Sequence, residues 1–449
     1  MHSGSDKMGE EMAARGSNDY DEDVGRIQKA VEDLYAFRDH FFERNSIDRA
    51  IHKSDELGQE LKKVIELLDE LQNQIKNRSE YMLQRGKALN VMPDFSPEAL
   101  ECLSKAVKLD PKSVEAWNQL GECYWKNKDI EAARNCFTGA LNHSRNKVSL
   151  RNLSMVMRQL GKTQEEKAKF IQDSVDHAKE AVQLDYTDGT SWFIAGNAYL
   201  TVFFNGGQKA GVLKQCLGAY SQAEKDMIQR SNPDLYFNRA TIFKFQEDYK
   251  ASLDGYRMAQ SLDPTWPEPQ EKLSELVTYL QNVTQLVQQK GKLKAKRLQQ
   301  LLASIKESDL GPFGGGSYTP PKGDPVKLEP TSLSRLSPGA NPEKVVLGKV
   351  VCSVVTDEPI PFTFAILDAE GSCFAVNIYN IAKGQGVIIG DSVAVPEPFV
   401  QHNDFVFDKT NVNFSSIRVD TPVALVVNGK KLGLEKQAPA VVSLYAKSE

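Results

Sequence analysis

The sequence predicts a mostly α-helical protein in which a superhelical solenoid of repeats is followed by a small all-β C-terminal barrel. Three observations support this fold class. Apolar residues recur at helical spacing from residue 24 to about residue 305, and a pattern of aromatic and small residues repeats within that region. After residue 343 the apolar period shortens to that of β-strands. The 449 residues correspond to about three folded units at the usual domain size.

The composition is that of a globular protein. With 41% hydrophobic and 26% charged residues, the chain holds enough apolar surface to offset the entropy cost of folding. The net charge of −5 argues against a protein that coats nucleic acid with its whole surface. Any contact with a polyanion must therefore be confined to a local basic region.

The cysteines and the N-terminus indicate a reducing compartment. The six cysteines are scattered, and none forms the C-x-x-C spacing of a zinc site or redox motif. The first residues contain no apolar stretch that could act as a signal sequence, and no run of about 18 apolar residues occurs. We therefore expect no metal, no cofactor and no membrane association, and a location in the cytoplasm and nucleus.

The N-terminal region divides into two parts. Residues 1–23 are small, polar and acidic, which predicts a disordered tail. Residues 24–78 carry apolar residues at helical spacing, first around Val31 and then around Leu61, so we expect two amphipathic helices there.

A strong repeat signal follows between Glu115 and Ala140. The tetratricopeptide repeat (TPR) pattern W-x2-L-G-x2-Y followed by A-x3-F-x2-A has seven marked positions. They are occupied here by Trp117, Leu120, Gly121, Tyr124, Ala133, Phe137 and Ala140. The match predicts a pair of antiparallel helices, with small residues where the two helices approach each other closely.

Five copies of this unit are predicted between residues 79 and 264. Related spacings begin near Gly86, Leu150, Trp192 and Tyr236, and the fourth copy carries an eight-residue insertion around residues 205–207. One repeat cannot bury its apolar faces alone, so the copies must stack into a solenoid. The first helix of each repeat then lines the inner groove.

The remaining chain shows three changes of composition. Residues 265–306 predict a capping helix with a basic extension, and residues 307–343 hold seven prolines and six glycines without periodicity, as in a linker. Residues 344–433 contain five or six short strands between turns, for which an OB-fold is the simplest assignment. Residues 434–449 form a C-terminal tail.

Motifs of catalysis are missing from the sequence. It contains no G-x-x-x-x-G-K-[ST], H-E-x-x-H or G-x-S-x-G. The glycines from Gly384 to Gly390 imitate a dinucleotide loop, but their spacing is one residue too long and they lie between predicted strands. We therefore expect a non-enzymatic protein whose function lies in its surfaces.

The repeat register predicts the groove residues. Positions 5, 9 and 12 of each first helix share one stripe that faces away from the packing within the repeat. In repeats two to five these positions hold Asn118, Glu122 and Trp125; Arg151, Met155 and Arg158; Phe193, Asn197 and Leu200; and Phe237, Thr241 and Lys244.

These side chains suit an extended peptide with one acidic and one apolar residue. Arg151 and Arg158 could form forked hydrogen bonds with a carboxylate, while Trp125, Met155 and Phe193 supply apolar walls. The alternative is that both arginines are solvated and paired locally, as exposed arginines often are.

A second candidate surface is the basic stretch near residue 295. Its five positive charges, Lys290, Lys292, Lys294, Lys296 and Arg297, lie within eight residues. Such a cluster can hold RNA phosphates, act as a nuclear localisation signal, or form a solvated helix end. The adjacent Leu298, Leu301 and Leu302 have the spacing of an L-x-x-L-L docking motif, which is also that of a packed helix face.

The predicted barrel carries aromatic residues on its strands. OB-folds often bind single-stranded nucleic acid through such residues, here Phe362, Phe364, Phe374 and Tyr379. Few Lys or Arg residues are interleaved with them, so core packing and a protein-docking role are favoured. The ligand of the barrel stays unknown from the sequence.

The combination of five TPRs, a Gly/Pro-rich segment and an OB-fold resembles the tetratricopeptide repeat protein five (Strap) family. The resemblance is carried by LSKAVKLDP, VEAWNQLGECYW, RNKVSLRNLSMVMRQL, NPDLYFNRAT and VIIGDSVAVPEP. It implies an adaptor at the ribosome, whose groove recognises the N-terminal peptide of nascent tubulin and which recruits a factor for tubulin mRNA decay. That peptide begins Met-Arg-Glu, so Arg158 is the expected partner of the glutamate. The basic stretch is the expected contact with ribosomal RNA or an acidic ribosomal surface.

The resemblance also implies an alternative role. In it the protein is a nuclear scaffold for a histone acetyltransferase co-activator and an actin-nucleating co-factor in the transcriptional response to stress and DNA damage. The ribosomal role predicts binding only to ribosomes that display a tubulin N-terminus. The nuclear role predicts co-activator binding without ribosome dependence.

Overall fold

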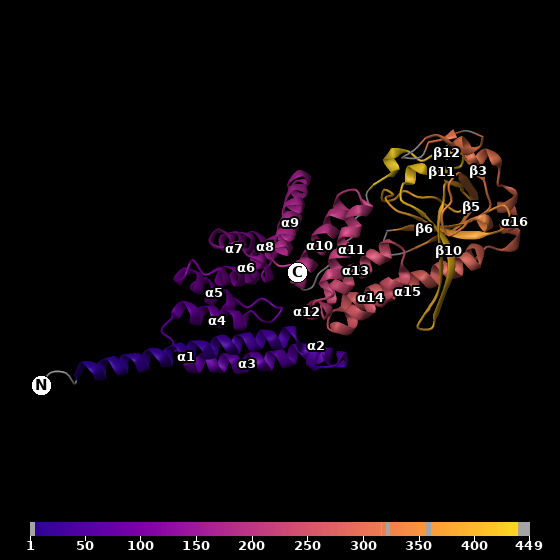
Figure 1. The fold of residues 1–449 in the computed structure, drawn as a ribbon. Helices are drawn as coiled ribbons and strands as arrows, with labels where there is room; N and C mark the ends of the chain where they lie inside the picture. The colour runs from indigo at the N-terminus through magenta and orange to yellow at the C-terminus, as the bar shows by residue number, and fades with distance from the viewer. Residues whose placement is uncertain (1–4, 316, 320–323, 356–360, 439–449) are drawn as a thin grey trace. The chain divides into compact units, whose positions relative to one another are not determined.

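A computed structural model describes residues 5–315, 317–319, 324–355 and 361–438, with side chains from residue 22 onward. Its contacts divide the chain into two compact units. The first contains the chain up to Arg239 together with Arg257–Pro267, and the second contains Ala240–Tyr256 and the chain from Glu268 onward. Figure 1 shows that the first part of the chain is helical and that the strands come from its last third.

The N-terminal segment forms two long helices, α1 (Ser5–Asp39) and α3 (Lys53–Leu71), joined by α2 (Phe41–Arg44) and η1 (Ile47–His52). Both predicted amphipathic helices are confirmed, because Val31 of α1 and Leu68 of α3 share one buried core. The predicted disordered tail is corrected, since α1 already begins at Ser5. Residues 8–15 include Met, Glu, Ala and Arg, which favour helix. Helix α1 can therefore continue from its packed part towards the N-terminus.

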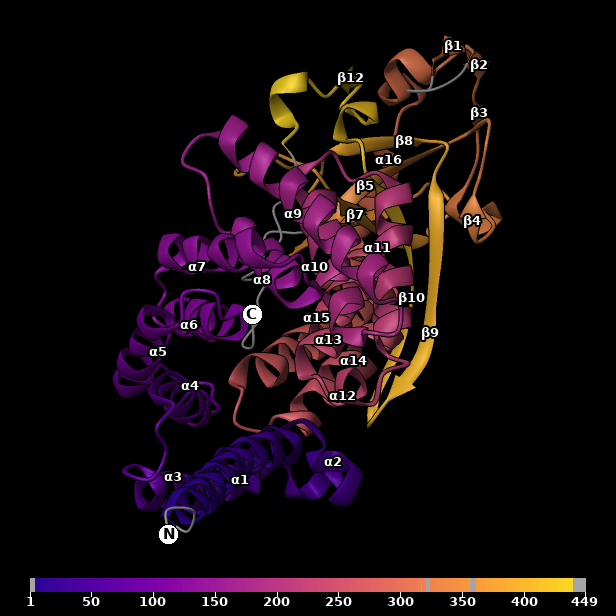
Figure 2. The same ribbon diagram turned by 60° about the vertical axis from the view of Figure 1, so that its left-hand side comes forward.

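Five helical hairpins follow, as the repeat pattern predicts. They are α4 (Arg78–Leu89) with α5 (Pro97–Leu109), α6 (Val114–Lys126) with α7 (Ile130–His143), α8 (Lys147–Met157) with α9 (Gln164–Leu184), α10 (Gly189–Asn205) with α11 (Ala210–Ala223), and α13 (Pro233–Phe245) with α14 (Tyr249–Leu262). A short helix, α12 (Met227–Arg230), precedes the last hairpin. Figure 2 shows α4 to α7 stacked in chain order.

Glycines mark the close approach of the two helices in three repeats. A Cβ atom built on Gly121 would lie 2.5 Å from the Phe137 ring, and one on Gly196 would lie 2.4 Å from the Tyr220 ring. The first pair is 16 residues apart and the second 24, which confirms the eight-residue insertion in the fourth repeat. Part of the insertion lengthens α10, which has 17 residues where α6 has 13.

Gly121→Ala is therefore expected to destabilise the protein by about 1 to 3 kcal/mol, because Phe137 is fully buried and cannot move away. Gly218→Ala is the matched control, since Gly218 of α11 has open space around its Cβ position. There the same substitution removes backbone entropy from the unfolded chain and should stabilise by about 0.5 to 1 kcal/mol. Urea unfolding followed by circular dichroism measures both, and equal effects would contradict the packing argument.

After the repeats come the capping helix α15 (Pro267–Gln288), η2 (Lys290–Lys292) and α16 (Ala295–Ala303), which lie in the second unit from Glu268 onward. Its main sheet has the strand order β12-β11-β8-β5-β6-β7-β10-β9-β4. The longer strands are β5 (Lys344–Val354), β6 (Phe362–Leu367), β7 (Cys373–Ile378), β8 (Ser392–Pro396), β9 (Phe399–Phe407) and β10 (Thr410–Val419). The shorter ones are β3 (Glu329–Pro330), β4 (Gly339–Ala340), β11 (Val426–Val427) and β12 (Lys430–Lys431). Strands β7 and β10 pair in parallel, whereas the other neighbours along this order pair antiparallel.

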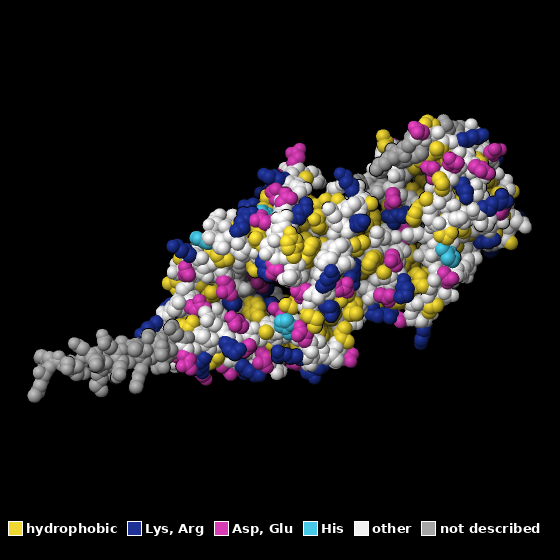
Figure 3. Space-filling model, viewed as in Figure 1, with side chains coloured by type: hydrophobic (Ala, Val, Ile, Leu, Met, Phe, Trp, Pro, Cys, Tyr) yellow, Lys and Arg dark blue, Asp and Glu magenta, His cyan; other side chains and the backbone are white. Residues whose placement is uncertain are grey.

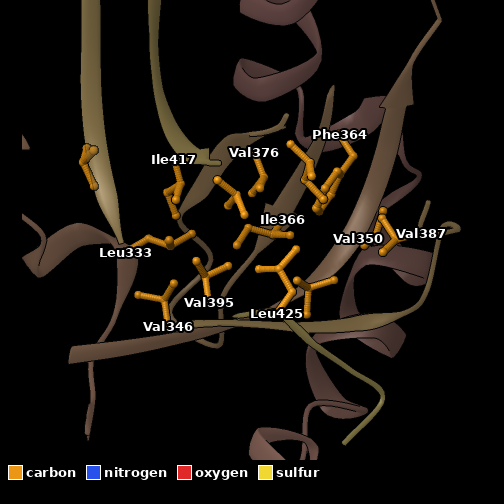
Figure 4. Packing of buried hydrophobic residues seen from close by; sticks show 14 residues of the cluster. Leu333, Val346, Val350, Phe364, Ile366, Val376, Val387, Val395, Ile417 and Leu425 are labelled. Atoms are coloured by element: carbon orange, nitrogen blue, oxygen red, sulfur yellow. The ribbon is translucent and has the colours of Figure 1, made fainter. Parts of the chain in front are cut away.

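The strands enclose a shared apolar core. Figure 4 shows Val350 of β5, Ile366 of β6, Val376 of β7 and Ile417 of β10 pointing towards one another. Of the aromatic residues that could have formed a nucleic-acid platform, Phe364 and Tyr379 are at most 1% exposed, and Phe362 and Phe374 pack against the core. The core interpretation of these four residues is confirmed.

The predicted linker at residues 307–343 is wrong. This segment folds as η3 (Glu307–Phe313), β1 (Ser317–Tyr318), β2 (Val326–Lys327), β3, η4 (Leu333–Arg335) and β4. Strand β3 pairs with β5, and β4 pairs with β9. Leu310, Phe313 and Leu328 are buried beside Val345 and Ala394 of the sheet. The apolar residues of this segment are too few to show a periodic pattern, but they still cover the edge of the sheet. Its prolines and glycines lie in the turns between these apolar residues.

A buried ion pair joins the turn between α13 and α14 to the barrel within the second unit. The Glu247 side chain is fully buried, and its carboxylate lies 3.6 Å from the guanidinium of Arg418 on β10. That guanidinium also lies over the Tyr379 ring, 3.9 Å from its centroid. Burial raises the pKa of Glu247, and the charge of Arg418 opposes that shift. The turn of the fifth hairpin is thus part of the barrel's packing.

Candidate binding groove

A cavity of about 490 Å³ lies within the first unit. Its lining comes from the first helices of repeats two, three and four, from the N-terminal segment, and from the region around α12 and the start of α13. The predicted groove lined by first helices is therefore present in these three repeats. The N-terminal segment was not predicted to take part.

Five of the predicted groove residues line this cavity. They are Glu122, Trp125, Arg151, Met155 and Phe193. Met155 and Phe193 are buried to 8% and 4% exposure, so they form apolar walls rather than free surface. The side chains at positions 9 and 12 of α6, and at positions 5 and 9 of α8, thus line the cavity.

Asn118 and Asn197 do not line the cavity, which corrects two predictions. The Asn118 side chain accepts a hydrogen bond of 2.8 Å from the Ser149 hydroxyl, and this bond links α6 to α8. Asn197 accepts hydrogen bonds from the Tyr220 hydroxyl at 2.6 Å and from the Asn238 amide at 3.1 Å. Adjacent repeats pack closely enough to cover both asparagines, which then hold the repeats together.

Arg158, Phe237, Thr241 and Lys244 are also not among the lining residues. Arg158 is the C-cap of α8 and keeps helical backbone angles (φ −62°, ψ −17°), but it is not among the residues that line the cavity. Phe237 packs against Trp266, with 4.8 Å between ring centroids. Thr241 and Lys244 belong to the second unit, where the Thr241 hydroxyl lies 3.2 Å from that of Tyr256. The predicted pair of groove arginines is thereby reduced to Arg151.

Arg151 is held by an ion pair. Its guanidinium lies 3.0 Å from the Asp188 carboxylate, and Asp188 also accepts a hydrogen bond of 3.1 Å from the Ser191 backbone at the start of α10. Burial alone would raise the pKa of Asp188, but the charge of Arg151 and the Ser191 bond lower it below its usual value. Asp188 stays charged and fixes the position of Arg151.

Lys126 of α6 is a cavity residue that the sequence did not reveal. Only 7% of its side chain is exposed. Its ammonium donates hydrogen bonds to the Met92 carbonyl at 2.9 Å and to the Asn90 side chain at 3.1 Å, and it lies 3.2 Å from the Glu122 carboxylate. Position 13 of a first helix lies outside the stripe used to predict the groove, so only its tertiary contacts place it here.

The N-terminal segment supplies a further wall, which includes Arg38 of α1 and Lys53 of α3. Burial alone would lower the pKa of Arg38, but the adjacent Asp39 carboxylate outweighs it and raises the pKa. Burial and the charge of Arg38 together lower the pKa of Lys53. Both residues come from the N-terminal segment, which was not predicted to line the groove.

The cavity also has acidic lining residues. Asp234 lies at the start of α13 and Asp263 follows α14, so both come from the fifth repeat. With Glu122 they bring negative charge into a cavity that holds four cationic side chains, Arg38, Lys53, Lys126 and Arg151. The groove can therefore hold a ligand that carries both charges and an apolar side chain.

Outside this cavity the face of the first unit is mixed in charge. Figure 3 shows Lys and Arg side chains interspersed with Asp and Glu over these helices. Among the residues that the structure describes, no group of acidic, histidine and cysteine side chains is arranged to hold a metal ion. No described helix is long and apolar enough to cross a membrane.

The basic stretch lies in the second unit and is not a single helix. Lys290 and Lys292 flank Gly291 in η2, and all three have positive φ, whereas Lys296 and Arg297 lie in α16. Lys292, Lys294, Lys296 and Arg297 are exposed. A Cβ on Gly291 would lie 2.4 Å from the Val351 carbonyl oxygen, so glycine allows this turn to approach β5.

Comparisons with known proteins agree with this architecture. Residues 327–441 match the model of the tetratricopeptide repeat protein 5 OB fold domain, and residues 97–128 and 114–146 match tetratricopeptide repeat models. The first match begins inside the stretch predicted as a linker. Tetratricopeptide repeat protein 5 of Homo sapiens is 48% identical over 420 residues, which cover 93% of this chain and 96% of the human protein. The protein of that name from Mus musculus has the same identity and coverage.

The similarity to solved structures is lower. The APC/C hetero-tetramer Cut9–Hcn1 aligns at 14% identity with a TM-score of 0.41, covering 49% of this chain and 40% of that chain.

Proposed function

The chain belongs to the tetratricopeptide repeat protein 5 family, and on that basis we propose that its groove binds the N-terminal peptide of nascent tubulin at the ribosome. The TPR repeats and OB domain support an adaptor that binds other proteins. In the proposed function the bound adaptor recruits a factor that triggers decay of the tubulin mRNA in the cytoplasm.

The observation that carries the proposal is the mixed chemistry of the cavity. A peptide that begins Met-Arg-Glu brings a positive α-amino group and guanidinium, a negative carboxylate and an apolar side chain. Asp234 and Asp263 offer negative charge to the first two groups, and Met155 and Phe193 offer apolar contact to the methionine. Arg151, already oriented by Asp188, replaces Arg158 as the partner of the glutamate.

The basic stretch supports ribosome contact in this proposal. Its exposed lysines and Arg297 lie close together on a protein of net charge −5, so they form a local site for phosphates. The groove then supplies specificity for the nascent chain, and the basic stretch supplies affinity for the ribosome.

Sedimentation with ribosome–nascent-chain complexes tests the proposal. The protein should co-sediment with ribosomes that display a tubulin N-terminus. Replacing the third-position glutamate of the nascent chain with glutamine should lower the affinity for these ribosomes by about tenfold or more, because one charge-assisted hydrogen-bonded contact is lost. Ribosomes that display an unrelated N-terminus are the control. Equal binding to all three complexes would contradict peptide recognition.

A further inference from the structure

Strand β9 leaves one of its two edges unpaired over most of its length. Along one edge its residues 399–407 pair antiparallel with β10, and Figure 2 shows β9 as a long strand beside β10. Along the other edge only Phe399 and Val400 are paired, with the short strand β4. No strand among the described residues pairs with residues 401–407 on that side, which we call the open edge.

Two observations show which backbone groups face the open edge. A two-residue turn at 408–409 connects β9 to β10, and Phe407 and Thr410 form the pair that closes it. The closing pair of such a hairpin is hydrogen-bonded, so the N–H and C=O groups of Phe407 point to β10. At the other end of β9, the side-chain amide of Asn341, which follows β4, donates to the Pro398 carbonyl at 3.1 Å.

The two observations agree, because backbone groups alternate in direction along a strand. Odd-numbered residues of β9 bond to β10, and even-numbered residues point the other way. The N–H and C=O groups of His402, Asp404 and Val406 therefore face the open edge. None of these backbone groups makes a hydrogen bond with another described residue. The open edge thus presents a row of unused donors and acceptors.

The open edge lacks most of the features that keep exposed edges from pairing. Natural edge strands are usually protected by lysine, proline or a β-bulge. Residues 401–407 contain neither lysine nor proline, and β9 pairs with β10 without a register shift. The side chain of Val406, which is 64% exposed, adds an apolar contact beside the edge. The edge can therefore accept a further antiparallel strand.

The exposed side chains of β9 indicate what that strand carries. His402, Asp404 and Val406 are all exposed, and alternate residues of a strand share one face. Asp404 is the one charged side chain between residues 401 and 407, so it favours lysine or arginine directly opposite. Val406 favours a β-branched apolar residue two positions away from that cation.

A second copy of β9 does not meet this pattern. The antiparallel register that pairs the whole of residues 401–407 with the same residues of another copy is centred on Asp404. It would place two Asp404 side chains directly opposite each other, and like charges in that position are destabilising. The open edge is better suited to a different chain.

We propose that the open edge of β9 binds an extended segment of a partner protein, which joins the barrel as an additional antiparallel strand. Main-chain hydrogen bonds supply the affinity of such strand addition. A basic residue opposite Asp404 and a β-branched residue opposite Val406 supply the specificity. The site lies in the second unit and uses no residue of the groove, so it is independent of the proposed peptide recognition.

Fluorescence polarisation with a labelled heptapeptide tests the site. The probe Thr-Val-Thr-Lys-Thr-Thr-Thr, aligned antiparallel to residues 401–407, places its lysine opposite Asp404, and it should bind the wild-type protein saturably. N-methylation of that lysine removes an N–H that points to β9 and should weaken binding by about tenfold or more. N-methylation of the threonine after it removes an N–H that points away, and should change the affinity by about twofold or less.

Two substitutions of Asp404 test the site from the side of the protein. Asp404→Lys should weaken binding of the probe about 3- to 10-fold and should favour a probe with glutamate in place of its lysine. Asp404→Pro should weaken both probes, because it removes the central N–H of the open edge, whereas the pairing with β10 does not use that N–H. Glu435→Lys is the matched control, since Glu435 is an exposed acidic residue of η6 (Leu434–Lys436) outside β9, and it should bind like the wild type.

Near-ultraviolet circular dichroism checks that each variant is folded, and Asp404→Lys decides alone if Asp404→Pro is not. The site is overturned if the probe does not bind the wild type, if the two N-methylated probes bind alike, or if the charge reversal does not exchange the preference. Sedimentation velocity tests the other occupant. A wild-type dimer that Asp404→Pro converts to a monomer would show that a second copy takes the edge, which would overturn the choice of partner.

Discussion

Arg418→Met is expected to lower the free energy of unfolding of the barrel-containing unit by about 3 to 5 kcal/mol. The substitution removes the positive charge that lies 3.6 Å from the fully buried Glu247 carboxylate. It also removes the cation over the Tyr379 ring. Burial already raises the pKa of Glu247, so without Arg418 this residue must either take up a proton or remain as an unpaired buried charge. Urea unfolding followed by near-ultraviolet circular dichroism measures the loss.

Two further variants test the cause of that loss. Arg335→Met is the matched control, because 74% of the Arg335 side chain is exposed, and it should change stability by less than about 0.5 kcal/mol. Adding Glu247→Gln to Arg418→Met should recover part of the stability, since the buried charge is then gone. A loss below about 1 kcal/mol for Arg418→Met, or no recovery in the double variant, would show that the ion pair is not what holds the turn to the barrel.

Arg151→Met is expected to weaken binding of a Met-Arg-Glu peptide by about 30-fold or more. Removing one partner of a partly buried charge contact costs about 2 to 5 kcal/mol of binding free energy. The variant also leaves Asp188 with one cation fewer, so that its negative charge repels the peptide glutamate. Isothermal titration with the purified protein measures the affinity, and a glutamine-substituted peptide should bind the variant and the wild type alike.

Arg158→Met provides the matched control for this prediction. Both arginines were predicted from one stripe of the third repeat, but only Arg151 lines the cavity. The Arg158 variant should therefore bind the peptide within about twofold of the wild type. If Arg158→Met abolished binding and Arg151→Met did not, the assignment of the glutamate partner would have to be reversed.

The repeats and the OB-fold could be predicted from the sequence because both depend on local patterns. Gly121 packs against Phe137, which follows it by 16 residues, and the corresponding glycines of the first and fourth repeats, Gly86 and Gly196, pack against Leu103 and Tyr220 of their own second helices. The repeat register predicted Trp125, Met155 and Phe193, which line the cavity, since the direction of a side chain on a helix follows from its position in the helix.

The groove positions that the structure does not place in the cavity depend on what packs around each side chain. Arg158, at the C-cap of α8, keeps helical backbone angles and still does not line the cavity. Asn118 and Asn197 were covered by neighbouring repeats. The stretch predicted as a linker folds onto the sheet through a few scattered residues, among them Leu310 and Phe313.

The sequence by itself determined the order of the repeat region and the barrel, the number of repeats, and five of the side chains that line the cavity. Only the tertiary structure decided that Arg38 and Lys53 share a cavity with Arg151, and that Asp234 and Asp263 bring the opposite charge to it. The physical reason is the distance along the chain between the residues that decide each feature. Helical periodicity is fixed within a few turns, whereas a cavity is formed by side chains more than two hundred residues apart, and no local pattern records that proximity.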